Sequence, residues 1–132
     1  MNIAFVCIQN SCRSQIAEAF GKKYFPDTIN CYSAGTNPAN QINPRAIKIM
    51  NEKYHIDMTQ KQYPKKISQL PPTDILVTMG CGIQCPYVSC KKLIEWNIED
   101  PVEKDDQTFN KIIEQIKNNV TNLKRGCDIS IQ

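Results

Sequence analysis

The fold is decided by one stretch of sequence near the N-terminus, Ile3-Ala4-Phe5-Val6-Cys7-Ile8-Gln9-Asn10-Ser11-Cys12-Arg13-Ser14. Its first four residues are apolar and predict a buried strand over residues 2–7. The residues that follow the stretch have apolar side chains at helical spacing and predict a helix over residues 14–25. A tight loop therefore joins a strand to a helix, with Cys7 at its start and Arg13 at its end.

This loop has the composition of an oxyanion-binding site. A loop at the N-terminus of a helix points unpaired backbone N–H groups at one position, where an anion can bind. The planar guanidinium of Arg13 suits a tetrahedral oxyanion, and the same positive field stabilises a cysteine thiolate at Cys7. We therefore expect Cys7 to be a nucleophile aimed at a phosphate-like anion. The expected oxyanion-binding residues are Ile8, Gln9, Asn10, Ser11, Cys12, Arg13 and Ser14.

The spacing Cys-x5-Arg is weak evidence by itself, because the chain contains seven cysteines. The alternative is a buried structural cysteine. The position between a strand and a helix favours the catalytic interpretation, as do Asn10 and Ser11, which suit a tight turn, and Ser14, which can hydrogen-bond a thiolate.

Length and composition fit one domain spanning residues 1–132, of which 41% are hydrophobic and 22% charged. The net charge of +3 is mild and the lysines are scattered, so nothing indicates nucleic acid or a membrane surface as a partner. No stretch approaches the ~20 apolar residues of a membrane span, and no targeting segment is evident. We expect a cytoplasmic monomer, in which seven cysteines indicate metal binding, catalysis or redox chemistry rather than structural disulfides.

The rest of the chain alternates strands with helices. Strands are predicted over residues 29–34, 74–79 and 93–96, a helix is predicted after Asn43-Pro44, and another over 106–124, ended by Gly126 and followed by a loose tail. This alternation predicts an α/β fold with a four-stranded parallel sheet, in the order 2-1-3-4, and helices on both faces. Ligands bind such sheets where the strand order reverses, which is where Cys7 ends the first strand.

A second group of cysteines follows the third predicted strand. Cys81, Cys85 and Cys90 have the spacing Cys-x3-Cys-x4-Cys, in a loop that we predict over residues 80–92. Thiols on a glycine-rich loop can pass a disulfide from one to another, and we favour this redox interpretation. A structural zinc site, with Cys127 or His55 as a fourth ligand, and inert packing are the alternatives.

Asp100-Pro101 follows the last predicted strand. A carboxyl group on a loop at this edge can protonate a leaving oxygen, although Asp-Pro is also a common turn. Structural roles are expected for three other residues: His55 as a solvated surface residue, Cys31 as a small buried hydrophobe, and Trp96 as part of the core or the pocket wall.

Taken together, the Cys-x5-Arg-Ser loop and the late Asp-Pro resemble the low-molecular-weight tyrosine phosphatase fold, and more closely the thioredoxin-coupled arsenate reductases of that fold. The similarity covers nearly the whole chain. The segments that carry it are Asn10-Ser11-Cys12-Arg13-Ser14-Gln15-Ile16-Ala17-Glu18-Ala19, Ser33-Ala34-Gly35-Thr36, Leu76-Val77-Thr78 and Trp96-Asn97-Ile98-Glu99-Asp100-Pro101. The extra cysteines separate the reductases from the phosphatases.

The resemblance implies that Cys7 attacks arsenate while the loop amides and Arg13 hold the oxyanion. Asp100 would protonate the departing oxygen. A cysteine of the 81–90 loop would then attack Cys7, release arsenite, and pass the disulfide to a further cysteine and on to an external thiol reductant such as thioredoxin, with no bound cofactor. Ser14 would stabilise the Cys7 thiolate and Asn10 would brace the loop.

Two features depart from the family pattern. The third cysteine of the family precedes a proline, which fits Cys85; Cys81 then lies closer to it than expected and Cys90 is additional. Some members also hold a potassium ion with an Asn, a Glu, a Ser and an Asp. Asn10, Glu18 and Ser33 match the first three, and the fourth position falls at or near Pro64.

Two other functions compete with the reductase interpretation. A tyrosine phosphatase would use Cys7, Arg13 and Asp100 with water as the second nucleophile, but Val102 stands where such phosphatases carry an aromatic residue beside Asp-Pro. A non-catalytic protein could use the close thiols to bind trivalent arsenic or zinc.

Overall fold

The computed structural model describes the backbone of residues 1–79 and 90–131, and the side chains of residues 1–79 and 90–124. Its elements, in chain order, are β1 (Asn2–Cys7), α1 (Arg13–Tyr24), β2 (Asn30–Gly35), α2 (Pro44–Tyr54), the 3-10 helix η1 (Ile67–Gln69), β3 (Thr73–Met79), β4 (Cys90–Trp96) and α3 (Asp106–Ile131). The four strands form one sheet in the order β2-β1-β3-β4, and every pairing is parallel. The predicted α/β class and strand order are confirmed.

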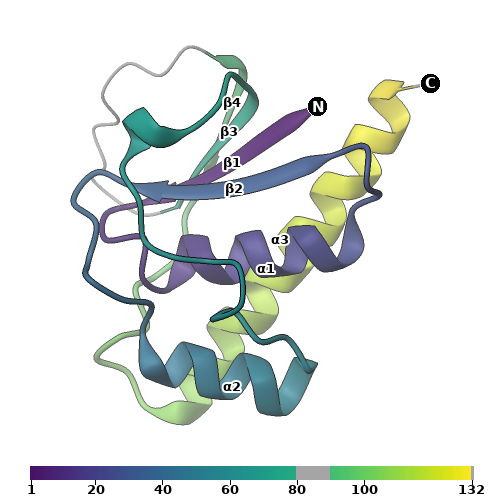
Figure 1. The fold of residues 1–132 in the computed structure, drawn as a ribbon. Coiled ribbons are helices and arrows are strands. Elements are labelled where there is room, and N and C mark those ends of the chain that lie inside the picture. Colours follow the sequence, from purple (N-terminus) through teal and green to yellow (C-terminus); the bar gives the residue numbers. More distant parts are fainter. Residues whose placement is uncertain (80–89, 132) are drawn as a thin grey trace.

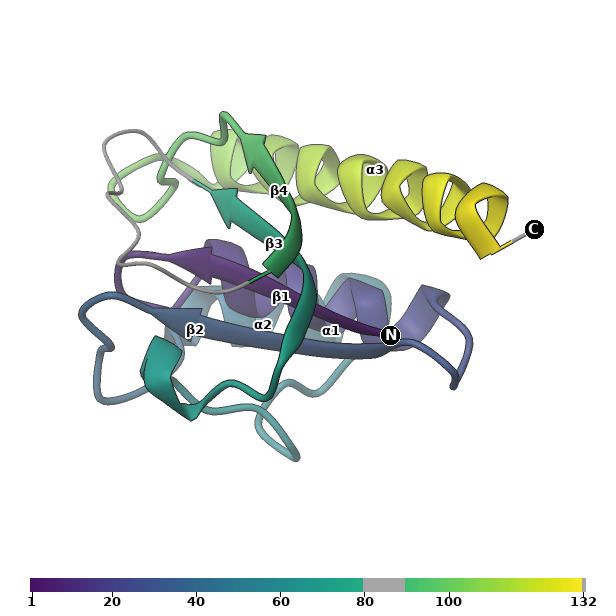
Figure 2. The same ribbon diagram turned by 90° about the horizontal axis from the view of Figure 1, so that it is seen from above.

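Alternate side chains of the strands point to opposite faces of the sheet. On β1, Ile3 and Phe5 join the large core shared with α1, α2 and α3, whereas Ala4 and Val6 join a small cluster on the opposite face. All three α-helices therefore lie on one side of the sheet (Figures 1 and 2). We expected helices on both faces of the sheet. Among the described residues, the other face is covered only by the 3-10 helix η1, whose Ile67 packs against the small cluster.

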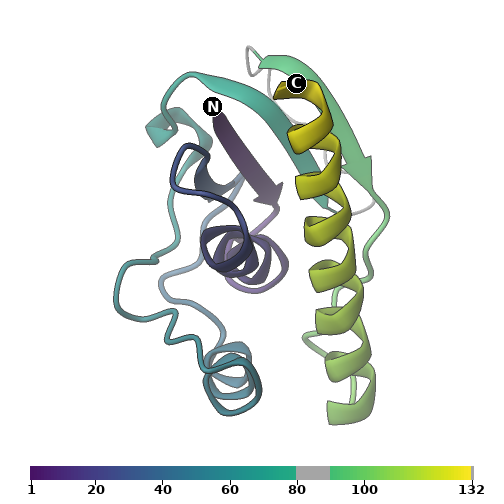
Figure 3. The same cartoon turned by 90° about the vertical axis from the view of Figure 1, so that its right-hand side faces the viewer.

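The helices form two tiers below the sheet. Figure 3 shows α1 directly under the strands, α3 beside it, and α2 farther from the sheet. The α2 helix begins as predicted, because the Asn43 side chain accepts hydrogen bonds from the N–H groups of Arg45 (2.9 Å) and Ala46 (3.1 Å), with Pro44 at the first helical position.

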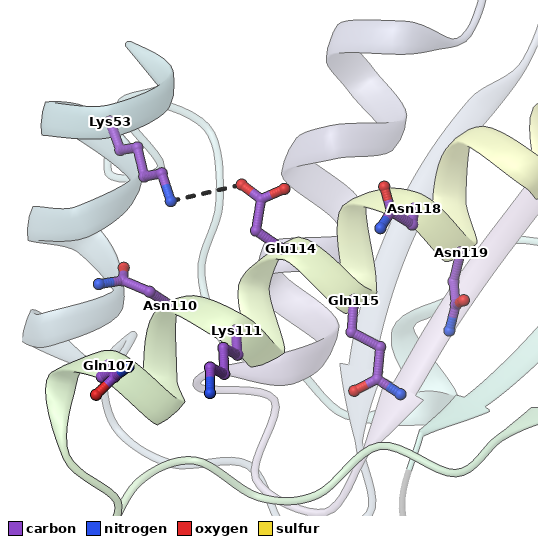
Figure 4. Close-up of a pocket in the computed structure, with 8 residues that line it drawn as sticks. All are labelled: Lys53, Gln107, Asn110, Lys111, Glu114, Gln115, Asn118 and Asn119. Atoms are coloured by element: carbon purple, nitrogen blue, oxygen red, sulfur yellow. Dashed lines mark ion pairs between the residues drawn. The ribbon is translucent and has the colours of Figure 1, made fainter.

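Contacts between charged and polar side chains connect α2 to α3. Lys53 of α2 pairs with Glu114 of α3 at 3.5 Å, as Figure 4 shows, and Tyr54 donates a hydrogen bond to the same carboxylate. That hydrogen bond lowers the pKa of Glu114, whereas burial, followed by the hydrogen bond, raises the pKa of Tyr54. The contact is therefore made by a neutral phenol and an ionised carboxylate at neutral pH.

Two predicted boundaries were wrong. Helix α3 continues through Gly126 to Ile131, where a helix end and a loose tail were expected. A glycine inside a helix costs only about 1 kcal/mol, so a single glycine does not have to end one. Strand β4 begins at Cys90 instead of residue 93, because β4 is an edge strand whose exposed positions accept Lys91 and Lys92.

The carboxyl ends of β1 and β2 meet where Cys7 pairs with Gly35. The backbone of the following loop passes so close to Gly35 that a Cβ atom there would lie 2.6 Å from the carbonyl oxygen of Ile8 and 2.9 Å from the amide nitrogen of Asn10. No side chain fits at this position unless the loop moves.

We predict that Gly35→Ala lowers the free energy of unfolding by about 1–3 kcal/mol, because the added methyl group clashes with backbone that cannot rotate away. Urea unfolding would measure this. Gly21→Ala is a matched control: its Cβ would meet the Cys31 sulfur at 2.6 Å, but alanine gains about 1 kcal/mol in helix propensity, so its loss should be smaller. Wild-type stability in Gly35→Ala would contradict the prediction.

Candidate active site

Residues 8–12 form the loop between β1 and α1, and the segment 36–43 after β2 braces it from outside. Backbone N–H groups of that segment donate to loop carbonyl oxygens, at 3.3 Å to Cys7, 2.8 Å to Ile8, 2.9 Å to Gln9 and 2.8 Å to Ser11. In a trans peptide the carbonyl and the next N–H point in opposite directions. The N–H groups of Ile8, Gln9, Asn10 and Cys12 therefore point away from the brace, as an oxyanion cradle requires.

The loop lines a small pocket at the carboxyl edge of the sheet. Its volume is about 110 Å³, and its lining residues are Cys7, Ile8, Gln9, Ser11, Cys12, Arg13, Asp100 and Val102. The structure thus brings together Cys7, Arg13 and Asp100, which are separated by up to 93 positions in the numbering of the chain. An anion held in this pocket would have a thiol on one side and a carboxyl group on another.

Arg13 is the first residue of α1, and its guanidinium is buried. One nitrogen donates to the carbonyl oxygen of Ile98 at 2.9 Å, and the other lies 3.9 Å from a carboxylate oxygen of Asp100. The Asp100 side chain is 59% exposed, so it stands at the mouth of the pocket. The Ile98 contact fixes the guanidinium plane and connects it to the segment that carries Asp100.

A directed set of hydrogen bonds ends at Cys7. The backbone N–H of Lys65 donates to Asn10 Oδ1 at 2.9 Å, which fixes the orientation of the Asn10 amide. Asn10 Nδ2 then donates to Ser14 Oγ at 2.8 Å, and Ser14 Oγ lies 2.8 Å from Cys7 Sγ. Because Ser14 accepts from Asn10, its own proton is free to point at the sulfur. This places the Ser14 side chain in hydrogen-bond contact with Cys7, as the sequence predicted.

Asn10 adopts a left-handed backbone conformation, with φ of 50°. Asparagine tolerates this region better than most residues, which fits its predicted role in bracing the loop. Its carbonyl oxygen accepts from Gln15 Nε2 at 3.0 Å, and the Gln15 side chain accepts in turn from Gln62 Nε2 at 2.8 Å. Lys65 and Gln62 support the loop but belong to no local motif, so sequence reasoning missed them; Gln15 lies in the segment that carries the resemblance, but its supporting role was not predicted.

Cys12 lines the same pocket but differs from Cys7 in its environment. Burial, and then the neighbouring Cys7, raise the pKa of the Cys12 thiol to about 12. A thiol with a raised pKa stays protonated through the neutral range, and protonated thiols are poor nucleophiles. Cys12 therefore contributes its backbone and its volume to the site, not a second thiolate.

Of the three cysteines of the second group, the structure describes only Cys90. Cys81 and Cys85 lie outside the described residues. Cys90 begins β4 opposite Thr73, whereas Cys7 is level with Met79, six residues farther along β3. At ~3.3 Å per residue this separates Cys90 from Cys7 by about 20 Å, and bridged cysteines require Cα atoms within ~7 Å. The structure does not bring Cys90 to the pocket.

The remaining predicted residues have the following positions. His55 is exposed at the end of α2, Cys31 is buried in β2, and Trp96 packs on Phe5 with ring centroids 5.8 Å apart, so the predicted surface and core placements are confirmed.

Glu18 and Ser33 are buried together beneath the loop. Within the part of the chain that the structure describes, no group of three or more His, Cys, Asp or Glu side chains could hold a metal ion.

A larger hollow of about 580 Å³ lies on the α2–α3 side of the molecule (Figure 4). All its lining residues are of polar or charged types, and all but Lys53 belong to α3: Lys53, Gln107, Asn110, Lys111, Glu114, Gln115, Asn118 and Asn119. It shares no residue with the pocket of Cys7, which contains the buried Arg13. Among the described helices, none is long and apolar enough to cross a membrane.

We predict that iodoacetamide at pH 7–8 modifies Cys7 much faster than Cys12, because burial raises the pKa of the Cys12 thiol and keeps it protonated, whereas the Ser14 hydroxyl is positioned to donate to the Cys7 sulfur. Peptide mapping by mass spectrometry at timed intervals would measure both rates. Ser14→Ala should slow modification of Cys7 and leave Cys12 slow. Equal rates at the two cysteines in the wild-type protein would be incompatible with the geometry described.

Comparison with known proteins agrees with the pocket. Residues 2–129 match the family model described as low molecular weight phosphotyrosine protein phosphatase. An arsenate reductase of Bacillus cereus (strain 03BB102) is 38% identical over 125 residues, which cover 89% of this chain and 90% of the relative.

Solved structures give the same result. An arsenate reductase in the phosphate-binding state superposes with a TM-score of 0.84 at 32% identity, covering 95% of this chain and 97% of that one. The Corynebacterium glutamicum thioredoxin-dependent arsenate reductase gives a TM-score of 0.79 at 30% identity. The match covers 98% of this chain and 62% of that chain. The predicted resemblance is confirmed: this chain belongs to the low molecular weight phosphotyrosine protein phosphatase family and, within it, to the arsenate reductases.

Proposed function

We propose that this protein reduces arsenate to arsenite, with Cys7 as the nucleophile. The observation that carries the proposal is the placement of the Cys7 sulfur in a pocket walled by the oxyanion loop, with Arg13 and Asp100 on its other sides. The Cys7 thiolate forms a bond to arsenic, and one arsenate oxygen departs as water. Loop amides and Arg13 hold the remaining oxygens through charge-assisted hydrogen bonds.

Asp100 is the proposed general acid. Its carboxyl group lies at the pocket mouth near Arg13, where it can protonate the departing oxygen. A second thiol then attacks the Cys7 sulfur, which breaks the S–As bond. The two thiols supply two electrons, so As(V) leaves as As(III) and a disulfide remains on the protein.

We propose Cys81 or Cys85 as the source of that second thiol. The chain leaves the sheet at Met79, at the same edge as Cys7, and Cys81 is the second residue after it. Cys90, about 20 Å away at the opposite edge, would have to leave β4 to attack Cys7. It is therefore excluded from the first thiol exchange in the proposed sequence.

Each turnover leaves a disulfide, so an external thiol reductant must restore the enzyme. A thioredoxin-type protein is the proposed reductant, supported by the thioredoxin-dependent relative from Corynebacterium glutamicum. The reaction requires no bound cofactor in this scheme.

Phosphatase activity is the second candidate, because a phosphate ester could place its phosphoryl group in the same pocket. At about 110 Å³ the pocket holds the oxyanion, and an aryl group would remain outside, against Val102, which is 42% exposed. An aliphatic side chain gives such a ring less to stack on than an aromatic one. We therefore expect slow hydrolysis of aryl phosphates as a side activity.

The test is NADPH consumption after arsenate is added to the protein with thioredoxin and thioredoxin reductase. We expect sustained turnover that is lost in Cys7→Ser and in one or both of Cys81→Ser and Cys85→Ser, but kept within a few-fold in Cys90→Ser. Brisk aryl phosphate hydrolysis without arsenate-dependent turnover would replace this proposal with the phosphatase. Loss of turnover in Cys90→Ser, with folding intact, would overturn the assignment of the second thiol.

The position of Asp100 depends on Arg45 of α2. The Arg45 guanidinium donates to the carbonyl oxygens of Pro101 (3.0 Å) and Val102 (3.1 Å), and it stacks over the Phe109 ring at 4.2 Å. This contact spans the loop that carries Asp100 and the start of α3. Arg45 is thus a positioning residue for the proposed acid.

We predict that Arg45→Ala lowers kcat about 10–100-fold with a smaller change in KM, because the oxyanion cradle remains while the acid is misplaced. Lys53→Ala, on the same helix but in contact with Glu114, is the control. Unchanged kcat in Arg45→Ala would refute this role.

A further inference from the structure

A buried charge cluster lies directly beneath the oxyanion loop. Glu18 of α1 is 2% exposed, and Ser33 of β2 is fully buried. Ser33 donates a hydrogen bond to Glu18 Oε1 at 2.5 Å, and Lys22 pairs with Glu18 Oε2 at 2.5 Å. A carboxylate so far from water requires positive charge beside it, because burial of an unpaired charge is costly.

Lys65 supplies positive charge to the inner side of this cluster. Its ammonium donates to the Ser33 carbonyl oxygen at 2.9 Å and lies 3.8 Å from Glu18 Oε1, and its side chain is 11% exposed. The Lys65 backbone is fixed as well, since its N–H donates to Asn10 Oδ1 and its carbonyl accepts from Gly35 at 2.9 Å. One residue therefore contacts both the charge cluster and the loop.

These contacts disagree with the potassium site that the family resemblance implies. Such a site would use oxygen atoms of Asn10, Glu18 and Ser33 as ligands, with a fourth position at or near Pro64. Here Asn10 Oδ1 is taken by the Lys65 N–H, and the Lys65 ammonium sits against Glu18 and the Ser33 carbonyl. A second cation among the same oxygens would meet a like charge at close range. The residues present do not fit a bound potassium ion.

We propose that Lys65 is a tethered cation that takes the place of a free monovalent ion and positions the nucleophile. The ammonium compensates Glu18, which holds Lys65 in place. The Lys65 N–H then orients Asn10, Asn10 orients Ser14, and Ser14 directs its proton at Cys7. A tethered charge is always present, so the enzyme does not depend on the potassium concentration. The positioning role rests on Cys7 being the proposed nucleophile.

The cluster opens to solvent, which makes the proposal testable with the metal ion itself. Glu18, Lys22, Lys61 and Lys65 all line a pocket of about 410 Å³ on the outside of α1 and β2. Truncating Lys65 would leave its ammonium position accessible to an ion from solution. Replacing Lys65 with methionine would remove the charge but keep most of the volume.

The first measurement is thermal unfolding in KCl and in choline chloride at equal ionic strength, since choline is too large for the vacated position. The wild-type protein should give the same midpoint in both salts. Lys65→Ala should lose several degrees in choline chloride and regain much of that loss in KCl, whereas Lys65→Met should lose stability in both. Lys61→Ala, which alters the same pocket away from Glu18, should behave as wild type.

The second measurement is the rate of Cys7 alkylation by iodoacetamide under the same salts. It should fall in Lys65→Ala, recover with KCl, and stay low in Lys65→Met. Neither measurement uses arsenate, so both remain valid if the reductase proposal fails. A potassium-specific rise in the wild-type midpoint would overturn the inference, and so would a Lys65→Ala variant whose midpoint and alkylation rate match those of Lys61→Ala. If Lys65→Ala does not fold, the wild-type comparison still decides.

Discussion

The site depends on three consecutive hydrogen bonds, the first two of which have N–H donors and therefore a fixed direction. The backbone N–H of Lys65 can only donate, so the side-chain oxygen of Asn10 must face that N–H. The side-chain nitrogen of Asn10 must then face Ser14. The serine hydroxyl then has its proton left for Cys7, 2.8 Å away. If the Asn10 amide were turned round, Ser14 would donate to Asn10, and a lone pair of the Ser14 oxygen would face the Cys7 sulfur in place of a proton. The backbone N–H of Lys65 thus determines which group of Ser14 faces the Cys7 sulfur.

The same loop is held from its outer side by peptide geometry. Carbonyl oxygens of residues 7–9 and 11 accept from the segment 36–43, so the N–H groups that follow them point inward. Gly35 allows the two backbones to approach, since a Cβ would lie 2.6 Å from the Ile8 oxygen. The cradle is therefore formed before any anion arrives. Preorganised donors of this kind stabilise charge without rearranging during the reaction.

Local patterns in the sequence were sufficient for the loop and for the start of α2, because both are decided by neighbouring residues. The strand order followed from the alternation of strands and helices along the chain. The hydrophobic spacing of α3 was equally informative, and Phe109, Ile113 and Ile116, which recur at that spacing, are buried. Contacts between distant segments left no such signal. Arg45 and Lys65 are ordinary charged residues in sequence, and they matter only because folding places them against the Asp100 loop and beneath Asn10.

The position of Cys90 shows why closeness in sequence led to a wrong prediction. Cys85 and Cys90 are five positions apart, and they were treated as members of one loop. The predicted loop over residues 80–92 includes Lys91 and Lys92, yet an edge strand accepts exposed lysines and needs a hydrogen-bonding partner on one side only, which β3 provides. Once Cys90 pairs with β3 at the level of Thr73, parallel geometry separates it from Cys7 by the full length of the sheet. Of Cys81, Cys85 and Cys90, only the two that come before β4 therefore remain candidates for the second thiol of the proposed relay.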